Sequence, residues 1–199
     1  MQLRSSQASP FGRKVKIAAH FLGLFDRITI VMADTSDPQD SLRSQNPLGK
    51  IPVLILDDGA TIYDSRVIVE YLDYLAGGGR IIPAGAAKFD VLTRQALADG
   101  IMDAALLQVY ERRLRPPEQH SAKWLETHAG KVSRGLGYFE NTIGAFDPAL
   151  DIASIALACA LGYLDLRFEG SWRQDYPKLA AWLAEFEVAV PAYGMTRPV

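Results

Sequence analysis

The sequence predicts a chain in two parts, an α/β part followed by an all-helical part. Short apolar runs bounded by turn residues, which are typical of strands, occur only before about residue 76. From Lys88 onward, apolar residues instead recur every three or four positions, which is typical of helices. With 199 residues, 49% of them hydrophobic, the chain can bury a sizeable core in one large or two small domains.

The first part begins with a strand, a helix and a second strand. We expect these elements at residues 2–5, 10–22 and 27–31, followed by a polar loop. Pro10 suits the first turn of the helix, because the N–H that proline lacks has no partner at that position. Together with the segment that follows the loop, this order gives a βαβ unit and then a ββα unit.

In the segment that follows the loop, residues 46–75, almost every residue belongs to a predicted strand, turn or helix. Its expected elements are a strand at 53–56, an Asp-Gly type hairpin turn at 57–59 and a returning strand at 61–63. Either Asp64 or Ser65 then caps a helix. We expect this helix to place four apolar residues on one face, namely Val67, Ile68, Tyr71 and Leu75.

The second part contains only helical patterns. The glycines at 77–79 stop the preceding helix, and Ile82-Pro83 begins a linker. We therefore expect two domains, at residues 1–78 and 86–199. Helical periodicity recurs in four segments, around residues 89–110, 124–143, 152–166 and 179–188.

Composition argues against several classes of partner and compartment. The formal net charge of −2 and the lack of a basic block argue against nucleic acid or an anionic membrane as the main partner. No run approaches the roughly 18 apolar residues of a membrane span, and the N-terminus lacks an apolar signal core. We therefore expect a soluble, cytoplasmic protein.

Neither the cysteine nor the histidines indicate a metal or redox site. The single cysteine, Cys159, excludes an intrachain disulfide. Its apolar helical surroundings predict that it packs rather than reacts. Since His20, His120 and His128 show no ligand spacing, we predict no metal.

Two predicted helix starts carry groups that suit a ligand. An exposed helix N-terminus offers unpaired N–H groups and about half a positive charge. The N–H and hydroxyl of Ser65 therefore suit a carboxylate, while Asp64 suits an ammonium, so the pair fits a zwitterionic amino-acid head. Alternatively, the pair only caps its helix. Ser9, before Pro10, is a cap whose hydroxyl proton stays free to donate, because capping uses an oxygen lone pair.

These motifs resemble the glutathione transferase family. The resemblance rests on residues 46–75 and extends through residues 94–100 and 155–165 of the helical part. It implies a thioredoxin-like N-terminal domain that binds glutathione and an all-helical C-terminal domain that holds the second substrate. In that family the proline matching Pro52 is cis, and the Asp-Ser pair matching Asp64-Ser65 holds the γ-glutamyl end of glutathione.

The resemblance implies further site residues and partners. Backbone groups of Ile51 or Val53 would pair with glutathione as an added strand, and Lys50 would pair with its glycine carboxylate. A hydrophobic small-molecule electrophile would lie between the domains, near Phe11, which would also contact glutathione, and near Met102 or Leu106, Tyr110 and Phe168. A homodimer and a role in detoxification are also implied.

By the same resemblance, Ser9 occupies the position where some classes carry a cysteine before Pro-Phe. A serine cannot form a mixed disulfide, so the expected chemistry is stabilisation of the thiolate of glutathione. A free thiol has a pKa of about 8.5, and each unit of lowering needs about 1.4 kcal/mol, which a hydroxyl donor and a helix N-terminus can supply. Ser5 and Ser6 are alternative donors. The alternative functions are a non-catalytic binding or protein-interaction module and a glutathione-dependent isomerase or lyase.

Two further expectations concern charged and capping residues. Arg13 and Lys14 would face solvent, as charged residues on amphipathic helices usually do. The central helix of the family usually begins with Ser or Thr three residues before Asp, whereas this chain has Asp151 and Ser154. Asp151 would still cap by accepting from the N–H at position 154, at a small cost in stability.

Overall fold

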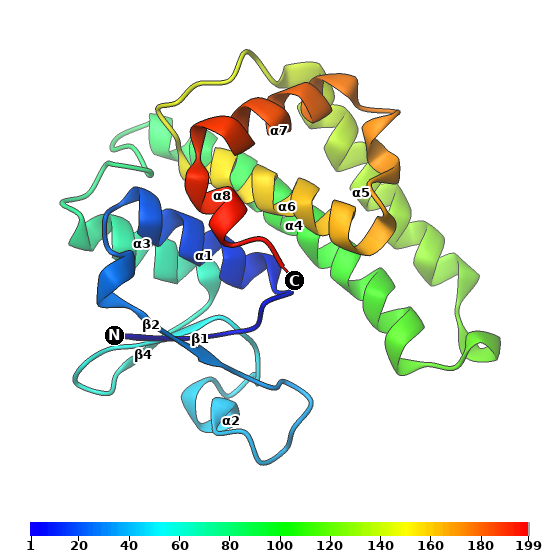
Figure 1. The fold of residues 1–199 in the computed structure, drawn as a ribbon. Coiled ribbons are helices and arrows are strands. Elements are labelled where there is room, and N and C mark those ends of the chain that lie inside the picture. The colour runs from blue at the N-terminus through cyan, green and yellow to red at the C-terminus, as the bar shows by residue number, and fades with distance from the viewer. Residues whose placement is uncertain (199) are drawn as a thin grey trace.

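A computed structural model of the chain describes residues 1–198. The strands are β1 (Gln2–Ser5), β2 (Thr29–Met32), β3 (Val53–Ile55) and β4 (Thr61–Ile62). They form one sheet in the order β2-β1-β3-β4, in which β1 runs parallel to β2 and β3 runs antiparallel to β1 and β4 (Figure 1). This confirms the predicted βαβ-ββα part with its thioredoxin-like order.

Across the described chain, three α-helices cover the sheet, and five more form the second part of the chain. α1 (Pro10–Phe21) and α3 (Ser65–Leu75) lie together on one side of the sheet, and the short α2 (Leu42–Gln45) lies on the other (Figure 1). The second part consists of α4 (Ala87–Leu114), α5 (Ala122–Thr142), α6 (Ile152–Phe168), α7 (Pro177–Ala189) and α8 (Pro191–Met195). The all-helical prediction is confirmed. α2 and α8 were not predicted, because helices this short show no periodic pattern.

One apolar core spans both parts. α6 lies at its centre and is apolar on all sides, since every residue from Ile152 to Leu164 except Ser154 is buried. α4 packs along α6, and α1 packs against α6 and α3 (Figure 1). The β/α part and the helical part therefore stabilise each other through shared contacts.

A buried carboxylate holds the segment between α3 and α4. Asp73 accepts from the N–H groups of residues 79–81, each at 2.9 Å. The carbonyl of Ile81 in turn accepts from the N–H of Ile152, at 2.9 Å. A side chain of α3 thus fixes the segment that follows the glycines at 77–79, and a backbone hydrogen bond joins this segment to the start of α6. The expected domain boundary, between residues 78 and 86, falls in this segment and stays a prediction.

The buried face of α3 differs from the predicted one. Ile68 and Leu72 are buried, but Val67 is 51% exposed, so the prediction that Val67 shares one face with Ile68 was wrong. Successive helical residues are turned by about 100°, so Val67 shares a side with Tyr71 and Tyr74 rather than with Ile68. Tyr74 is 73% exposed. The structure therefore leaves an apolar strip of α3 uncovered.

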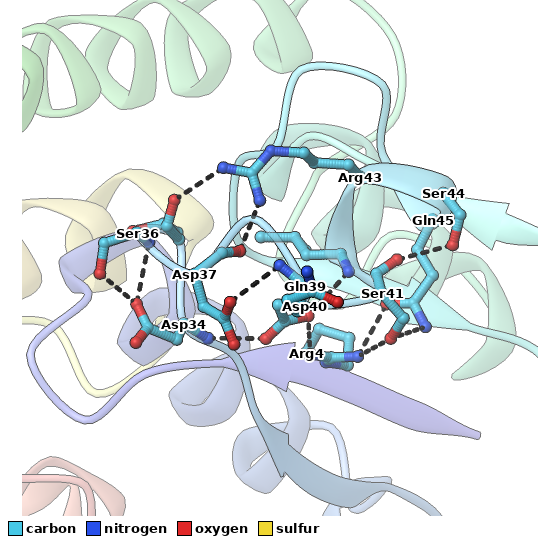
Figure 2. Close-up of polar contacts among 12 residues, drawn as sticks. Arg4, Asp34, Ser36, Asp37, Gln39, Asp40, Ser41, Arg43, Ser44 and Gln45 are labelled. Carbon is cyan, nitrogen blue, oxygen red and sulfur yellow. Dashed lines mark hydrogen bonds and ion pairs between the residues drawn. The ribbon is translucent and has the colours of Figure 1, made fainter.

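The polar loop between β2 and β3 is organised around Arg4 of β1 (Figure 2). The Arg4 guanidinium donates to three side chains of the loop, Asp40 at 2.5 Å, Ser41 at 2.9 Å and Gln45 at 3.0 Å. The Asp40 carboxylate also accepts from the N–H groups of Asp34 and Leu42. These bonds hold α2 against the sheet and fix the path of the chain toward Asn46.

Candidate functional site

The turn before β3 is shaped by Asn46, whose role the sequence reasoning missed. Its buried side-chain amide donates to the carbonyl of Lys50 at 2.9 Å, and its amide oxygen accepts from the N–H of Leu48 at 3.0 Å. The peptide bond before Pro52 is cis, as predicted. Ile51 is half-buried, whereas Lys50 is exposed. The turn therefore presents Lys50 to solvent and Ile51 to the base of the loop.

The start of α3 exposes Asp64 to solvent and covers Ser65. Of the two predicted caps, Asp64 is the one observed, and it accepts from the N–H of Arg66 at 3.0 Å. Ser65 is only 3% exposed, and within residues 1–198 the side-chain hydrogen bond at this helix start is made by Asp64 and not by the Ser65 hydroxyl. The N–H of Ser65 lies in the first helical turn, where backbone acceptors are absent. An anion at this end would meet an unused N–H and an unused hydroxyl, next to the exposed carboxylate of Asp64.

The start of α1 is capped by Ser9. Its Oγ accepts from the N–H of Gly12 at 3.1 Å, which leaves the hydroxyl proton free. Ser5 is fully buried beneath α1, and its hydroxyl donates to the carbonyl of Ser6 at 3.3 Å. A Cβ at Gly12 would lie 2.1 Å from the Ser5 hydroxyl oxygen, so glycine is needed for this close approach of α1 to β1. Of the three serines considered, Ser9 is the one with an unused proton at a helix start.

A small hollow opens beside Ser9. It is lined by Ala8, Ser9, Pro10 and Arg13 from the start of α1, by Cys159, Gly162 and Tyr163 from α6, and by Pro198. Its volume is about 10 Å³, which is room for about one water, so a second substrate would have to extend outward from it. A larger hollow of about 260 Å³ lies at the other end of α1, between His20, Phe146 and Met195. Because α1 rises about 1.5 Å per residue, that second hollow is too far from Ser9 to serve the same chemistry.

Arg13 and Lys14 point inward, so the prediction that they face solvent was wrong. Arg13 donates to the carbonyl of Tyr193 at 2.6 Å, and its guanidinium carbon lies 3.9 Å from the centroid of the Tyr193 ring. Lys14 is 0% exposed and pairs with Asp99 of α4 at 2.7 Å. The reason is that α1 packs between α3 and the helical part, which covers both of its faces.

Asp99 bridges the two helix starts. Both of its carboxylate oxygens accept from Lys14 of α1, at 2.7 and 2.9 Å, and the second of them also accepts from Arg66 Nε of α3 at 2.9 Å. Arg66 directly follows Ser65 in the chain, so this carboxylate of α4 fixes the start of α3 relative to α1. A charge between buried Ala98 and Met102 on the apolar face of a helix was the sequence signal that could have identified Asp99.

A second carboxyl lies near this bridge. Shielding from water and then the charge of Asp99 raise the pKa of Asp103, while Arg66 and Lys50 oppose the rise. Arg66, the first of these cations, pairs with Asp99 at 2.9 Å, so it lies between the two carboxyls of α4 and the start of α3.

The predicted wall of the electrophile pocket is only partly at the surface. Met102 is fully buried in the core, so of the pair Met102 or Leu106, it is Leu106 that retains exposed surface. The other predicted wall residues with exposed surface are Phe11, Tyr110 and Phe168. Tyr163, which the sequence reasoning did not identify, reaches the hollow beside Ser9 from α6. Its signal was weak, because a tyrosine in an apolar helix is most simply a core residue.

Cys159 and Asp151 behave as predicted. Cys159 is fully buried, and burial raises the pKa of its thiol to about 11. Asp151 caps α6 by accepting from the N–H of Ser154 at 2.7 Å, and the Ser154 hydroxyl donates to the same carboxylate at 2.9 Å. Arg94 of α4 adds an ion pair to Asp151 at 2.9 Å.

The histidines make packing contacts. His20 stacks on Phe25 with ring centroids 3.7 Å apart, and His128 meets Trp124 edge-on. Across residues 1–198, no group of three or more His, Cys, Asp or Glu side chains is arranged to hold a metal ion. None of the helices in the described chain combines the length and apolar character needed to span a membrane.

Family models match both parts of the chain. The N-terminal domain of glutathione S-transferases matches residues 8–75, and the C-terminal domain matches residues 122–185. An Escherichia coli K12 protein described as the uncharacterized GST-like protein YibF is 33% identical over 203 residues, which cover 100% of this chain and 98% of that protein. The family models leave residues 76–121 between them, and the match to YibF extends over the whole chain.

Two similar crystal structures are of a glutathione transferase family member from Pseudomonas fluorescens Pf-5. The structure with bound glutathione is 44% identical, with a TM-score of 0.89, and covers 100% of this chain and 98% of that one. The structure with bound S-(propanoic acid)-glutathione is 43% identical, with a TM-score of 0.86, and covers 100% of both chains. This chain is therefore similar to the Pseudomonas fluorescens protein in both sequence and fold along its full length.

Proposed function

Since this chain belongs to the glutathione S-transferase family, we propose that it binds glutathione and adds the glutathione thiolate to a hydrophobic electrophile. The observation that carries this proposal is the pair of helix starts at Ser9 and Asp64-Ser65. Both starts have hydrogen-bonding groups that no residue of the described chain uses, and Asp99 bridges the helices that carry them.

Glutathione binding would use the start of α3 and the turn before β3. The γ-glutamyl carboxylate would accept from the N–H and hydroxyl of Ser65, and the γ-glutamyl ammonium would donate to Asp64. Lys50 would pair with the glycine carboxylate, and the backbone near Ile51 would pair with the peptide as an added strand. Phe11 would supply apolar contact beside the sulfur.

Activation of the sulfur would use the start of α1. The Ser9 hydroxyl would donate to the thiolate, and the N-terminal end of α1 would favour its negative charge. During transfer to an aryl chloride, the sulfur forms a bond to the ring carbon, chloride leaves with the bonding electron pair, and the thiol proton goes to solvent. Ser9 stabilises the ionised sulfur before this step and is not itself consumed.

The relatives support the glutathione half of the proposal. The Pseudomonas fluorescens protein has been solved with glutathione and with S-(propanoic acid)-glutathione. Its site therefore admits a glutathione whose sulfur carries a substituent. The whole-length match to that protein supports the proposal that this chain binds glutathione at the corresponding site.

A second candidate is a non-catalytic module that binds glutathione at the same residues, namely the start of α3 and the turn before β3. The hollow beside Ser9, at about 10 Å³, favours it, because little room is preformed for an electrophile. A glutathione-dependent isomerase or lyase would use the same residues. Turnover with a panel of electrophiles separates these candidates from a transferase.

The test combines binding, ionisation and turnover. Calorimetry should detect glutathione binding, and the protein should accelerate the reaction of glutathione with 1-chloro-2,4-dinitrobenzene. In Ser9→Ala, glutathione affinity should stay nearly unchanged, while the thiolate pKa in the complex should rise by about one unit, read from ultraviolet absorbance against pH. Turnover should then fall at neutral pH and partly recover at high pH.

A matched control for this test is Ser6→Ala, which should leave the thiolate pKa in place. Full activity and an unshifted pKa in Ser9→Ala would show that Ser9 only caps α1. Binding of glutathione without turnover of any electrophile in the panel would favour the non-catalytic module. Absence of glutathione binding would contradict the proposal as a whole.

We also propose that the protein is a homodimer. Val67 and Tyr74 of α3 and Phe89 of α4 are exposed apolar residues, and the ion pair between Glu70 and Lys88 brings these helices together. Such a patch is typical of a surface that a partner covers. Sedimentation that shows only a 21.9 kDa monomer at micromolar concentration would contradict the dimer.

A further inference from the structure

Three arginines without ion-pair partners lie at the ends of α4 and α6. Arg112 and Arg113 are in the last turn of α4, and Arg167 is in the last turn of α6. Within residues 1–198, none of the three has a carboxylate oxygen within the 4.0 Å of an ion pair. Arg113 and Arg167 are both exposed, so their charges face solvent.

The neighbouring carboxylates on the same helices are engaged elsewhere. Glu111 of α4 pairs with Arg115 at 3.3 Å. Asp165 of α6 pairs with Arg173 at 2.6 Å. Glu169, two residues after Arg167, is exposed and within residues 1–198 makes no ion pair, so it is the one unengaged carboxylate beside three unpaired arginines. This part of the surface therefore keeps a net positive charge.

Arg167 adjoins the hollow at Ser9 through Tyr163. Tyr163 lines that hollow, and the guanidinium carbon of Arg167, one helical turn later, lies 5.8 Å from the centroid of its ring. Burial raises the pKa of Tyr163, while the charges of Arg167 and Arg113 oppose the rise. The contact of Arg112 with Phe168, whose ring centroid lies 6.0 Å from the guanidinium carbon, places the last turn of α4, which also carries Arg113, beside the last turn of α6.

Apolar surface lies beside these charges. Leu106, Tyr110 and Arg113 follow one another at spacings of four and three residues, so they share one face of α4. Arg112 covers the ring of Phe168, with its guanidinium carbon 6.0 Å from the centroid. A ligand that extends outward from Ser9 would therefore meet aromatic surface first and guanidinium groups next.

The helix dipole explains only part of this arrangement. A cation in the last turn of a helix is stabilised by the partial negative charge at that end, which accounts for each arginine separately. The dipole does not require two such helix ends to lie side by side with three unpaired arginines and one unengaged carboxylate, Glu169, in the described part of the chain. Guanidinium groups in this setting suit a carboxylate, which they bind with two parallel hydrogen bonds.

We propose that Arg113 and Arg167 bind a carboxylate of the second substrate, so that the preferred electrophile is an aromatic molecule carrying an acid group. The inference rests on the proposed function, because it assigns the substrate class of the same site. The aromatic ring of this electrophile would contact Tyr110 and Tyr163, and its reacting carbon would lie toward Ser9.

Turnover of two matched electrophiles tests the inference. 4-Chloro-3-nitrobenzoate and 4-chloro-3-nitrobenzamide share ring and leaving group, and in both a carbon–sulfur bond forms as chloride leaves with its electron pair and the thiol proton passes to buffer. Each kcat/KM is divided by the uncatalysed rate with glutathione, which removes intrinsic reactivity. We expect the resulting enhancement to be about tenfold larger for the benzoate, and to fall with added NaCl.

Variants assign the preference to the arginines. Arg113→Gln and Arg167→Gln should each lower the benzoate enhancement by about tenfold and leave the benzamide enhancement within about twofold. Arg115→Gln is the matched control, because Arg115 ends the same helix but is paired with Glu111. It should leave both substrates unchanged. Equal losses for both substrates in Arg113→Gln and Arg167→Gln would overturn the inference.

Binding of the two products separates this inference from catalysis. Calorimetry with S-(4-carboxy-2-nitrophenyl)glutathione and its carboxamide analogue should show about tenfold tighter binding of the acid, lost in Arg113→Gln. Equal affinities in the unmodified protein would overturn the carboxylate site while leaving glutathione transfer intact. Tighter binding of the acid without turnover would support the site and contradict catalysis. Failure of glutathione and both conjugates to bind would overturn the proposed function and this inference together.

Discussion

The starts of α1 and α3 are similar in sequence and differ in their surroundings. Each helix follows an extended segment, and each is capped by a side chain, Ser9 or Asp64, that accepts from an N–H of the first turn. The start of α1 is covered by α6 and the end of the chain, whereas Asp64 is exposed. An enclosed helix end can shift the pKa of a thiol, because hydrogen bonds strengthen where water is excluded. An open helix end can admit a charged amino-acid head directly from solvent.

The difference comes from the helical part of the chain. Arg13 fastens α1 to Tyr193 near the end of the chain, while Arg66 joins α3 to Asp99 by a guanidinium whose side chain is half exposed. Local sequence supplies the same type of cap at both sites. Distant segments decide which of the two becomes enclosed.

The largest expected effect comes from removing the bridge between the two helix starts. Asp99→Leu leaves Lys14 buried and unpaired, and we expect it to lower the free energy of unfolding by about 3–5 kcal/mol. Denaturant unfolding measures the loss. The double variant Lys14→Met with Asp99→Leu is the matched control and should recover most of the stability, since no unpaired buried lysine remains. A loss below about 1 kcal/mol in Asp99→Leu would show that the bridge is not needed.

A smaller effect is expected from disturbing only the covered helix start. A Cβ at Gly162 would lie 2.5 Å from Arg13 Nη1 and from the Tyr193 hydroxyl, so Gly162→Ala should cost about 1–3 kcal/mol of stability. Thermal unfolding reports the change. Gly137→Ala in α5 meets no atom within 4 Å and should not destabilise the protein. Equal stability of the two variants would contradict the packing of Arg13 described above.

Glutathione binding should depend on the open helix start and should respond to salt. Asp64→Ala or Ser65→Ala should each weaken binding by about 1–3 kcal/mol in calorimetry, because a charged group of the ligand loses its partner. Added NaCl should weaken binding to the unmodified protein by screening exposed Asp64, while the pKa of the bound thiol near Ser9 should change little. Unchanged affinity in both variants would exclude the start of α3 as the binding platform.

The smallest effect at neutral pH concerns Cys159, which lines the hollow at the covered start. Its folded pKa of about 11 lies above that of a free thiol, so any stability linked to the neutral thiol is present at neutral pH and is lost only as the pH rises toward 11. A thiol reagent at pH 8 should leave Cys159 unmodified until the protein is unfolded. In Ser9→Cys, the new thiol at the N-terminus of α1 should react in the folded protein. Rapid labelling of Cys159 in the folded state would show that the hollow is open.

The sequence by itself determined the order of elements and the local groups that begin and end them. Periodicity separated the α/β part from the helical part. The caps at Ser9 and Asp151 were identified from a few neighbouring residues, and Asp64 was one of two candidate caps. These features depend on contacts between residues close in sequence, such as a hydroxyl and an N–H three positions later. Patterns of this kind are visible without knowledge of the rest of the chain.

The tertiary structure alone decided which of these groups are enclosed and what pairs with them. Lys14 and Asp99 are 85 positions apart, and Arg13 meets Tyr193 from 180 positions away. On a single amphipathic helix such charges are best placed in water, so their burial could not be predicted from α1 alone. The exposure of Val67, the burial of Met102 and the position of Tyr163 beside Ser9 have the same origin. The physical reason is that a buried charge or a covered helix end is stable only when another segment of the chain supplies its partner. The sequence of one segment alone does not show which distant residue that partner is.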